Sequence, residues 1–320
     1  MKILFITTKN KRFQSDFLEM TLLHGLRAIL GDDVVDYPRK KIMYHDFSES
    51  KKEDLHGRGF TLLTRPIKDV SKREEFTEFD FILYGSGHAY GEDCFIEEYD
   101  KFARYGSWVI DGHDLYGKAK KMKRYKGEDV VANQYEFSFK RELIFEEKNV
   151  YPTGFGIPEE AIRDINLNKK TKLFQKTYPK FALFEKPTDL GGSKEHHVFT
   201  NERDYYEDIA SSWFGLTSKK GGWDTLRHYE IIAGGALLLF RDYDKKPKMC
   251  SPQGLPCYSY SNKRELSTIM NKLIVNNKPS EDYINMMHLQ RKWLIEEGTT
   301  IARAKNLLNI LKNYKEKSIK

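Results

Sequence analysis

Arg227 and Glu230 stand three positions apart in the stretch TLRHYEIIAGGALLLF, which otherwise has the apolar content of a buried helix followed by a buried strand. Residues at this spacing share one face of a helix, so both charged side chains project together near the helix N-terminus. A guanidinium fork suits a phosphate, and a carboxylate accepts hydrogen bonds from paired hydroxyls such as those of a ribose. Buried charges need partners, and the pair therefore predicts a nucleotide-binding helix.

The segment SKKGG precedes this helix and adds positive charge and a flexible backbone. A glycine-bearing loop that leads into a helix N-terminus presents amide hydrogens to an anion. We therefore expect the phosphates of a ligand near Lys219, Gly221, Gly222 and Thr225.

The ends of the helix are marked by residues that favour helix termini. Asp224 is expected to cap a helix beginning at Thr225, and Gly234-Gly235 to end it before a strand over 236–240. The alternative for Arg227 and Glu230 is an intrahelical ion pair on a solvated face, which contributes only about 0.2–0.5 kcal/mol.

A second cluster of titratable side chains occurs in SWVIDGHDLYG, where a buried strand leads into a polar loop. In parallel α/β sheets, ligands bind beyond the carboxyl ends of the strands. Asp111, His113 and Asp114 are therefore candidates to accept a proton from a substrate. The competing interpretation treats Asp111 as a turn residue ahead of Gly112.

Elements of two kinds must position these residues, because short β-branched runs alternate with amphipathic stretches of helical period. This alternation is typical of parallel sheets covered by helices. Helices are expected over 16–30 and 264–275, among others. The predicted strands are 2–7, 34–37, 79–85, 107–111, 149–154, 181–184, 213–217, 236–240 and 257–261.

The lysine-rich stretch 165–180 separates two strand-and-helix sets, which predicts two Rossmann-like lobes facing across a cleft. The first lobe is expected over 1–165 and the second over 166–320. The C-terminal stretch has helical period with a break near Gly298.

Composition narrows the classes of protein. No apolar run approaches the length of about 20 residues that a membrane span needs, and the apolar part of the first residues is too short for a signal peptide. The three cysteines cannot form a complete set of disulfides and do not have metal-binding spacing, so we expect a reducing cytoplasm. If the protein is viral, this would be the cytoplasm of the host. The net charge of +7 favours an anionic partner.

The segment TLRHYEIIAGGALLLF resembles the nucleotide-sugar binding segment of two-lobed, B-type glycosyltransferases, and most closely that of phage DNA β-glucosyltransferases. The resemblance implies that Arg227 holds the diphosphate and Glu230 the ribose of a UDP-sugar. It also implies that Asp111 is the base, with Asp114 or His113 as substitutes. Where those enzymes have further arginines, this chain offers only Lys186 and Lys194.

The resemblance extends more thinly to other segments of the chain. FDFILYGSGHAYG, which contains His88, corresponds to a strand with a glycine-bearing polar loop, and His88 is expected to contact the acceptor. EGTTIARAKNLL resembles the closing helix that returns to the first lobe.

A basic segment, KAKKMKRYKG, directly follows the loop that contains Asp111. Basic residues with an aromatic side chain can grip a phosphate backbone and guide a base into a cleft, although such a run is also typical of a solvated helix face. The acceptor contacts predicted here are Lys120, Lys121, Lys123, Arg124 and Tyr125.

Together these features predict a glycosyltransferase that moves a sugar from a nucleotide donor to a hydroxyl, favouring hydroxymethylated bases in double-stranded DNA. Transfer to a polysaccharide or other glycan remains an alternative, as does a nucleotide-binding protein without turnover. A dehydrogenase is disfavoured because the first strand-to-helix turn, TTKNKRFQS, lacks glycine. No metal-binding residues are predicted. Asp242-x-Asp244 is a short pattern in a lysine-rich stretch that is expected to be a surface loop, and His196-His197 lacks further ligands at a recognisable spacing.

Overall fold

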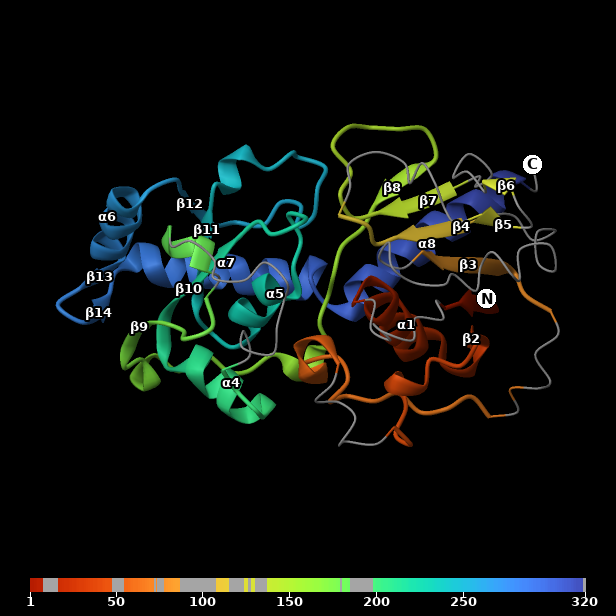
Figure 1. Cartoon of the computed structure of the whole chain (residues 1–320), viewed down its shortest axis with the longest axis horizontal. Helices are drawn as coiled ribbons and strands as arrows, with labels where there is room; N and C mark the ends of the chain where they lie inside the picture. The colour runs from red at the N-terminus through yellow and green to blue at the C-terminus, as the bar shows by residue number, and fades with distance from the viewer. Residues whose placement is uncertain are drawn as a thin grey trace.

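The computed structural model describes residues 1–7, 17–47, 55–71, 73, 78–86, 108–114, 124–125, 128–129, 137–178, 180–184 and 198–318. Two parallel sheets lie side by side along the long axis of the molecule (Figure 1). The chain is therefore an α/β protein with a Rossmann-like sheet in each half.

The first sheet has six parallel strands in the order β2-β1-β3-β4-β7-β8. β1 and β4 are buried along their whole length, as expected for parallel strands that helices cover. The strand order reverses between β1 and β3, and ligands of such sheets bind beyond the carboxyl ends at this kind of position. The strands are β1 (Ile3–Ile6), β2 (Val34–Tyr37), β3 (Phe81–Ser86), β4 (Trp108–Asp111), β7 (Phe137–Lys140) and β8 (Val150–Pro152).

The second sheet has four parallel strands in the order β12-β11-β10-β9. They are β9 (Lys172–Phe174), β10 (Ser212–Ser218), β11 (Leu237–Arg241) and β12 (Tyr258–Tyr260). Two small antiparallel pairs stand apart from these sheets: β5 (Arg124–Tyr125) with β6 (Glu128–Asp129), and β13 (Ile274–Val275) with β14 (Lys278–Pro279).

The α-helices of the described residues are α1 (Phe17–Leu30), α4 (Glu202–Ala210), α5 (Leu226–Ala233), α6 (Lys263–Leu273), α7 (Glu281–Glu297) and α8 (Thr300–Ser318). Asn201, Asn262 and Ser280 cap α4, α6 and α7 through their side chains, which satisfies backbone N–H groups of the first turns. None of these described helices is long and apolar enough to cross a membrane.

Short 3-10 helices connect several of these elements. They are η1 (Gly31–Asp33), η2 (Lys41–Met43), η3 (His56–Gly59), η7 (Glu159–Ala161), η8 (Leu167–Lys169), η9 (Lys180–Leu183) and η11 (Tyr243–Lys245).

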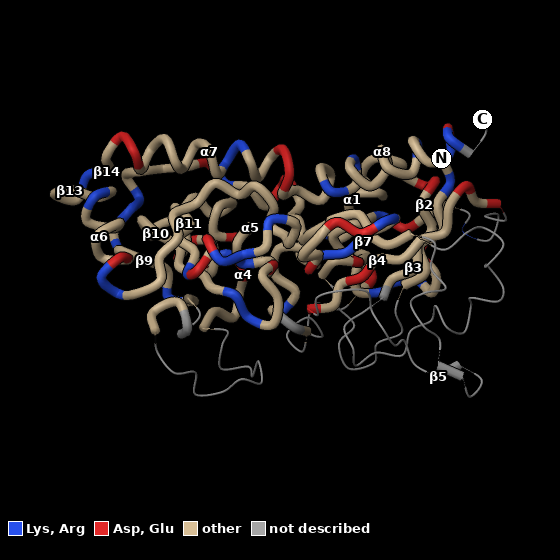
Figure 2. The backbone as a smooth tube through the Cα atoms, turned by 90° about the horizontal axis from the view of Figure 1, so that it is seen from above, with Lys and Arg blue, Asp and Glu red and all other residues tan. Residues whose placement is uncertain are grey.

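The last two helices join the halves, as Figure 2 shows: α7 runs beside the second sheet and α8 continues beside the first. α8 packs closely on α1, since a Cβ on Gly25 would lie 1.9 Å from the carbonyl oxygen of Thr300. His24 Nδ1 lies 2.9 Å from the Thr300 hydroxyl, and the Tyr314 ring packs edge-on against Trp108 of β4. The end of the chain thus covers the first sheet, in agreement with the returning helix that the resemblance implied, and the helices break near Gly298 as their period indicated.

The structure confirms eight of the nine predicted strands and both named helices, with shifts of one or two residues at most ends. The ninth, 181–184, is wrong: Lys180–Leu183 forms the 3-10 helix η9, and the left-handed φ of +62° at Phe184 follows it. Two strands of the sheets were missed. β9 lies inside the predicted linker, and β7 lies in NQYEFSFKREL, whose mixed polarity hid it.

Candidate functional site

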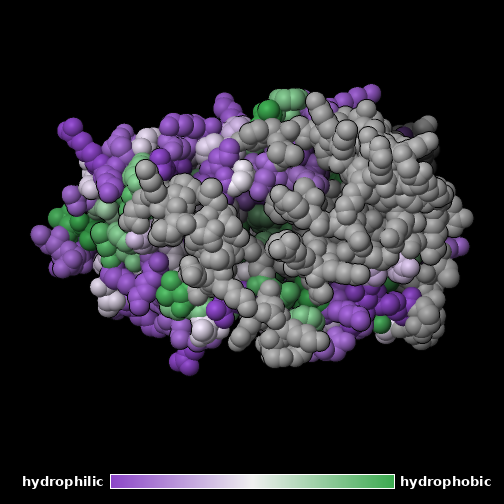
Figure 3. All heavy atoms as spheres, in the orientation of Figure 1, coloured by the Kyte–Doolittle hydropathy of each residue, from purple (hydrophilic) through white to green (hydrophobic). Residues whose placement is uncertain are grey.

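The loop after β4 and the loop before α5 lie against each other, although they come from different sheets. A Cβ on Gly221 would lie 2.2 Å from Oδ2 of Asp114, and one on Gly222 would lie 2.3 Å from Oε1 of Glu142. A side chain at either position would have to displace a carboxylate, so the two glycines let the loop before α5 lie close to Asp114 and to Glu142. On the face that Figure 3 shows, hydrophilic residues predominate among the described ones.

Asp111 ends β4 as a buried anion with two cationic or polar neighbours. Its Oδ2 accepts a hydrogen bond from Lys140 Nζ at 2.7 Å, and its Oδ1 accepts one from the backbone N–H of His113 at 3.0 Å. His113 Nδ1 lies 2.9 Å from the same Oδ1. Asp111 is 2% exposed and Lys140 1%, whereas the His113 side chain is 14% exposed.

The surroundings of Asp111 make it a weaker candidate than His113 to accept a proton from a substrate. Burial would raise the pKa of Asp111, but the His113 hydrogen bond and the Lys140 charge outweigh it and the pKa is lowered. A carboxylate that is buried, paired and weakly basic is a poor proton acceptor for a substrate. A carboxylate bonded to Nδ1 instead holds the proton on that nitrogen and makes Nε2 the basic one.

Arg141 and Glu142, at the end of β7, form a buried charged centre between the two loops that sequence reasoning missed. Arg141 donates to the Asp224 carbonyl at 2.7 Å and the Gly112 carbonyl at 3.0 Å, and it also pairs with Asp114. Glu142 accepts from the Asp224 N–H at 3.1 Å. Figure 2 shows charges of both signs gathered between β7 and α5. The run KRE directly after the alternating segment FSF was the signal that could have found them.

Arg227 and Glu230 lie in α5, as predicted, but their side chains have separate partners. Arg227 donates to the carbonyl of Thr177, in the segment after β9. Glu230 accepts from the hydroxyls of Thr61 and Tyr205, both at 2.6 Å. No ion pair joins the two described side chains, so the intrahelical alternative is not realised.

Glu230 is a buried carboxylate in polar surroundings. Burial raises its pKa, and the hydroxyl groups of Thr61 and Tyr205 and the charge of Arg227 counteract that rise. A carboxylate whose oxygens already receive hydroxyl groups is chemically suited to the paired hydroxyls of a sugar ring.

Asp224 does not cap α5, which corrects the prediction from the sequence. Thr225 is the N-cap residue and makes no side-chain cap hydrogen bond, and the helix begins at Leu226. Asp224 instead accepts from the Phe155 N–H and the Tyr229 hydroxyl, each at 2.8 Å. One carboxylate oxygen satisfies the buried N–H of Phe155, from the first half, and the other accepts from Tyr229 within α5, so neither caps the first turn. Gly234 and Gly235 end α5 as predicted, with φ of +84° at Gly235.

His228 of α5 contacts both the loop before this helix and β10 through its two ring nitrogens. Its Nε2 lies 2.9 Å from the carbonyl oxygen of Trp223, and its Nδ1 lies 3.0 Å from the hydroxyl of Thr217. A carbonyl only accepts, so Nε2 carries the proton and Nδ1 accepts from the Thr217 hydroxyl. Lys219 Nζ lies 5.1 Å from the centre of the Trp223 ring, in a cation–π contact at the loop surface.

Several predicted site residues lie outside the described residues. Arg124 and Tyr125 form β5, whose backbone alone is described. The remaining ones are Lys186 and Lys194 of the donor prediction and His88, Lys120, Lys121 and Lys123 of the acceptor prediction.

The described residues hold no group of three or more His, Cys, Asp or Glu side chains placed to bind a metal ion. Asp242 is the N-cap residue of the 3-10 helix η11 and Asp244 lies within that helix. Asp242 pairs with Lys245 at 2.6 Å, and Asp244 accepts from the Ser259 hydroxyl.

No protein-family model matches the chain, and no curated protein matches it either.

Proposed function

We propose that this protein is a glycosyltransferase that moves a sugar from a nucleoside diphosphate donor, a UDP-sugar by resemblance, to a hydroxyl group. The proposal assigns the two halves to a B-type arrangement, with the acceptor bound mainly by the first half and the donor by the second. The observation that carries it is the contact between the loop of Asp111, His113 and Asp114 and the loop of Gly221 and Gly222.

The donor would bind at the N-terminus of α5. The two glycines and Lys219 would face its phosphates together with Arg227, and Glu230 would accept the ribose hydroxyls. Support comes from the position of Lys219, Gly221 and Gly222 directly after the carboxyl end of β10, where ligands of parallel sheets bind. The open N–H groups of a helix N-terminus add to the attraction for phosphate.

His113 would be the general base and Asp111 the residue that positions it. Direct displacement of a diphosphate by a hydroxyl needs a group that takes the hydroxyl proton as the new glycosidic bond forms and the bond to the diphosphate breaks. His113 meets this need better than Asp111, because it is the more exposed of the two and Asp111 holds its Nδ1. Asp114 would act through Arg141, which fixes the loop.

The acceptor we propose is a hydroxymethylated base in double-stranded DNA, which rests on the resemblance and on the net charge of +7. A transfer assay tests the proposal, with a panel of UDP-sugars offered together with hydroxymethylcytosine DNA, unmodified DNA or simple glycosides. Transfer to the modified DNA alone supports the whole proposal. Transfer to glycosides keeps the donor site and moves the function to glycan assembly, and absence of both transfer and donor hydrolysis contradicts the proposal.

A further inference from the structure

The carboxylate of Glu230 is occupied from the opposite half of the molecule. Thr61 lies between η3 and β3 in the first half, and its hydroxyl donates to Oε1 of Glu230 at 2.6 Å. Tyr205 of α4 donates to Oε2 at the same distance. The Tyr206 hydroxyl lies 2.9 Å from that of Thr61, so all three hydroxyl groups form one buried network around the carboxylate.

The segment 55–65, here called the latch, is fastened to α4 by further contacts. Glu202, in the first turn of α4, accepts from the Thr61 N–H at 2.6 Å and from Arg65 Nη1 at 2.8 Å. The ring of Phe60 packs against that of Tyr205, with centroids 5.9 Å apart. The latch therefore bridges the halves at the side of α5 that carries Glu230.

The backbone of the latch is strained where it meets Glu230. Thr61 has φ of +71°, a left-handed conformation that a β-branched residue rarely adopts. Gly57, Arg58 and Gly59 also have positive φ, between +53° and +68°. Such a conformation persists because the contacts with Glu230 and Glu202 hold it, and release of these contacts would relieve the strain.

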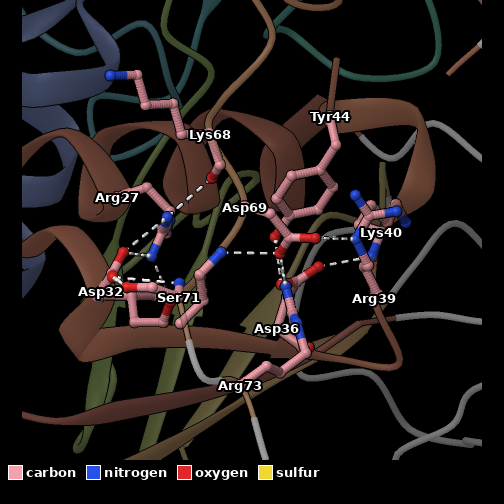
Figure 4. Close-up of polar contacts among 12 residues, drawn as sticks. Arg27, Asp32, Asp36, Arg39, Lys40, Tyr44, Lys68, Asp69, Ser71 and Arg73 are labelled. Carbon is pink, nitrogen blue, oxygen red and sulfur yellow. Dashed lines mark hydrogen bonds and ion pairs between the residues drawn. The ribbon is translucent and has the colours of Figure 1, made fainter. Parts of the chain in front are cut away.

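The far end of the latch is anchored independently. Figure 4 shows an ion-pair network beside the end of β2, in which Arg73 and Arg39 both pair with Asp69 at 2.7 Å. Arg73 also pairs with the buried carboxylate of Asp36 at 2.9 Å. The Ile67 N–H donates to the carbonyl of Met43 at 2.8 Å. Ile67, Asp69 and Arg73 are thus fixed to the first half by contacts that do not involve Glu230.

We propose that the latch closes the ribose position and that the donor nucleotide must displace Thr61 to bind. The inference rests on the proposed function, in which Glu230 receives a ribose. Thr61 and Tyr205 now satisfy the two oxygens of Glu230. Removal of Thr61 would open Oε1 to the hydroxyls of a ribose, while Tyr205, on α4 of the second half, can stay at Oε2. A buried carboxylate without partners is costly, so Thr61 satisfies it until a ribose replaces the Thr61 hydroxyl.

Displacement of the latch makes a specific prediction about affinity. When the binding-competent form is only a fraction of the molecules, the apparent affinity is reduced by that fraction. Weakening the latch must therefore tighten nucleotide binding, whereas a merely structural contact between the halves would leave it unchanged or weaken it.

The test is calorimetric titration with UDP of the wild-type protein, Thr61→Val and Glu202→Gln. Thr61→Val removes the hydroxyl at Glu230, and Glu202→Gln weakens the latch without touching Glu230. Both are expected to bind UDP about fivefold to tenfold more tightly than wild type. Thr61→Ser is the matched control, because it keeps the hydroxyl and should keep the wild-type affinity. UDP should also speed amide hydrogen exchange in residues 57–65 of the wild-type protein, whereas a bound ligand ordinarily slows exchange around its site.

The outcomes separate the latch from the proposed function. If wild type binds UDP and both variants bind it equally or more weakly, the proposed displacement of the latch is wrong, while the proposed nucleotide site is retained. If none of the proteins binds UDP, the proposed nucleotide site is wrong, and the proposal for the latch fails with it.

Discussion

His113 Nδ1 lies 2.9 Å from Oδ1 of Asp111, and Lys140 holds the other oxygen of the same carboxylate at 2.7 Å. The lysine keeps Asp111 ionised in a buried position, and the aspartate keeps the His113 ring in one orientation. The three side chains come from β4, the loop after it and the neighbouring strand β7. A histidine held in this way is suited to accept a proton through Nε2.

Replacing Asp111 by Asn should abolish most activity without weakening donor binding. The amide would no longer fix the proton on Nδ1, and a loss of roughly 10²–10⁴ in kcat is expected. The substitution also leaves Lys140 buried without its partner, which should cost about 3–5 kcal/mol of stability.

The double variant Asp111→Asn with Lys140→Met separates these two effects. Removing the unpaired ammonium should restore much of the free energy of unfolding, measured in urea, while kcat stays low. Recovery of kcat together with stability would show that Asp111 has only a structural role.

Arg227→Lys should lower UDP affinity although the charge is kept. Lysine binds phosphate as a point charge and lacks the bidentate fork of arginine. Glu230→Gln should also weaken the binding of UDP. It should change the affinity for pyrophosphate little, because pyrophosphate has no ribose for Glu230 to contact. The same titration with UDP and pyrophosphate checks both variants, and wild-type affinity for UDP in either one would argue against its assigned contact.

Much of the fold followed from local pattern, because both sheets consist of short apolar runs bounded by polar turns. The segment around α5 is such a case, and its helix, its glycine end and β11 were all predicted. β9 escaped prediction because it is a three-residue edge strand with only partial burial.

The sequence selected several residues of the loops that meet at the candidate site, but it missed Arg141 and Glu142 and did not predict the pairings. Asp111, His113, Arg227 and Glu230 were selected by residue type and by place after strands. That Lys140 pairs with Asp111 and Thr61 with Glu230 depends on contacts 29 and 169 residues apart in the sequence. No local pattern contains such pairings, and Asp224 shows the consequence: its sequence neighbours favour a helix cap, yet its partner is the N–H of Phe155.

Gly222→Ala should destabilise the protein more than Gly221→Ala. The new methyl group at 222 meets Glu142 and Arg141, which are fully buried and fixed by each other. At 221 it meets the end of Asp114, whose side chain is 31% exposed and can turn away. Overpacking in the fixed environment should cost about 1–3 kcal/mol in urea unfolding. An equal loss of stability in the two variants would mean that Glu142 and Arg141 do not form a more rigid environment for position 222 than Asp114 does for position 221.

His228 should make stability depend on pH below neutrality. Burial lowers its pKa from 6.5 to about 4, against the raising effect of Asp224. Between these values the unfolded chain binds a proton that the folded protein does not, so the free energy of unfolding is highest above pH 6.5 and falls as the pH decreases toward 4. The loss from this group should reach about 3 kcal/mol.

His228→Gln is the variant that isolates this contribution, since buried His24 also has a lowered pKa and adds its own share. Urea unfolding of both proteins at pH 7, 6 and 5 should show a shallower decrease for the variant. Parallel curves would mean that His228 is protonated equally in the folded and unfolded states.

The most direct test of the proposed chemistry compares wild type with His113→Gln in turnover of UDP-sugars, with UDP affinity measured on the same preparations. We expect wild type to transfer or hydrolyse one of the sugars. We expect the variant to lose about 10²–10⁴ in kcat while its affinity for UDP is kept. Equal turnover by the two proteins, or a wild-type protein that neither binds UDP nor turns over any UDP-sugar, would contradict the proposed role of His113.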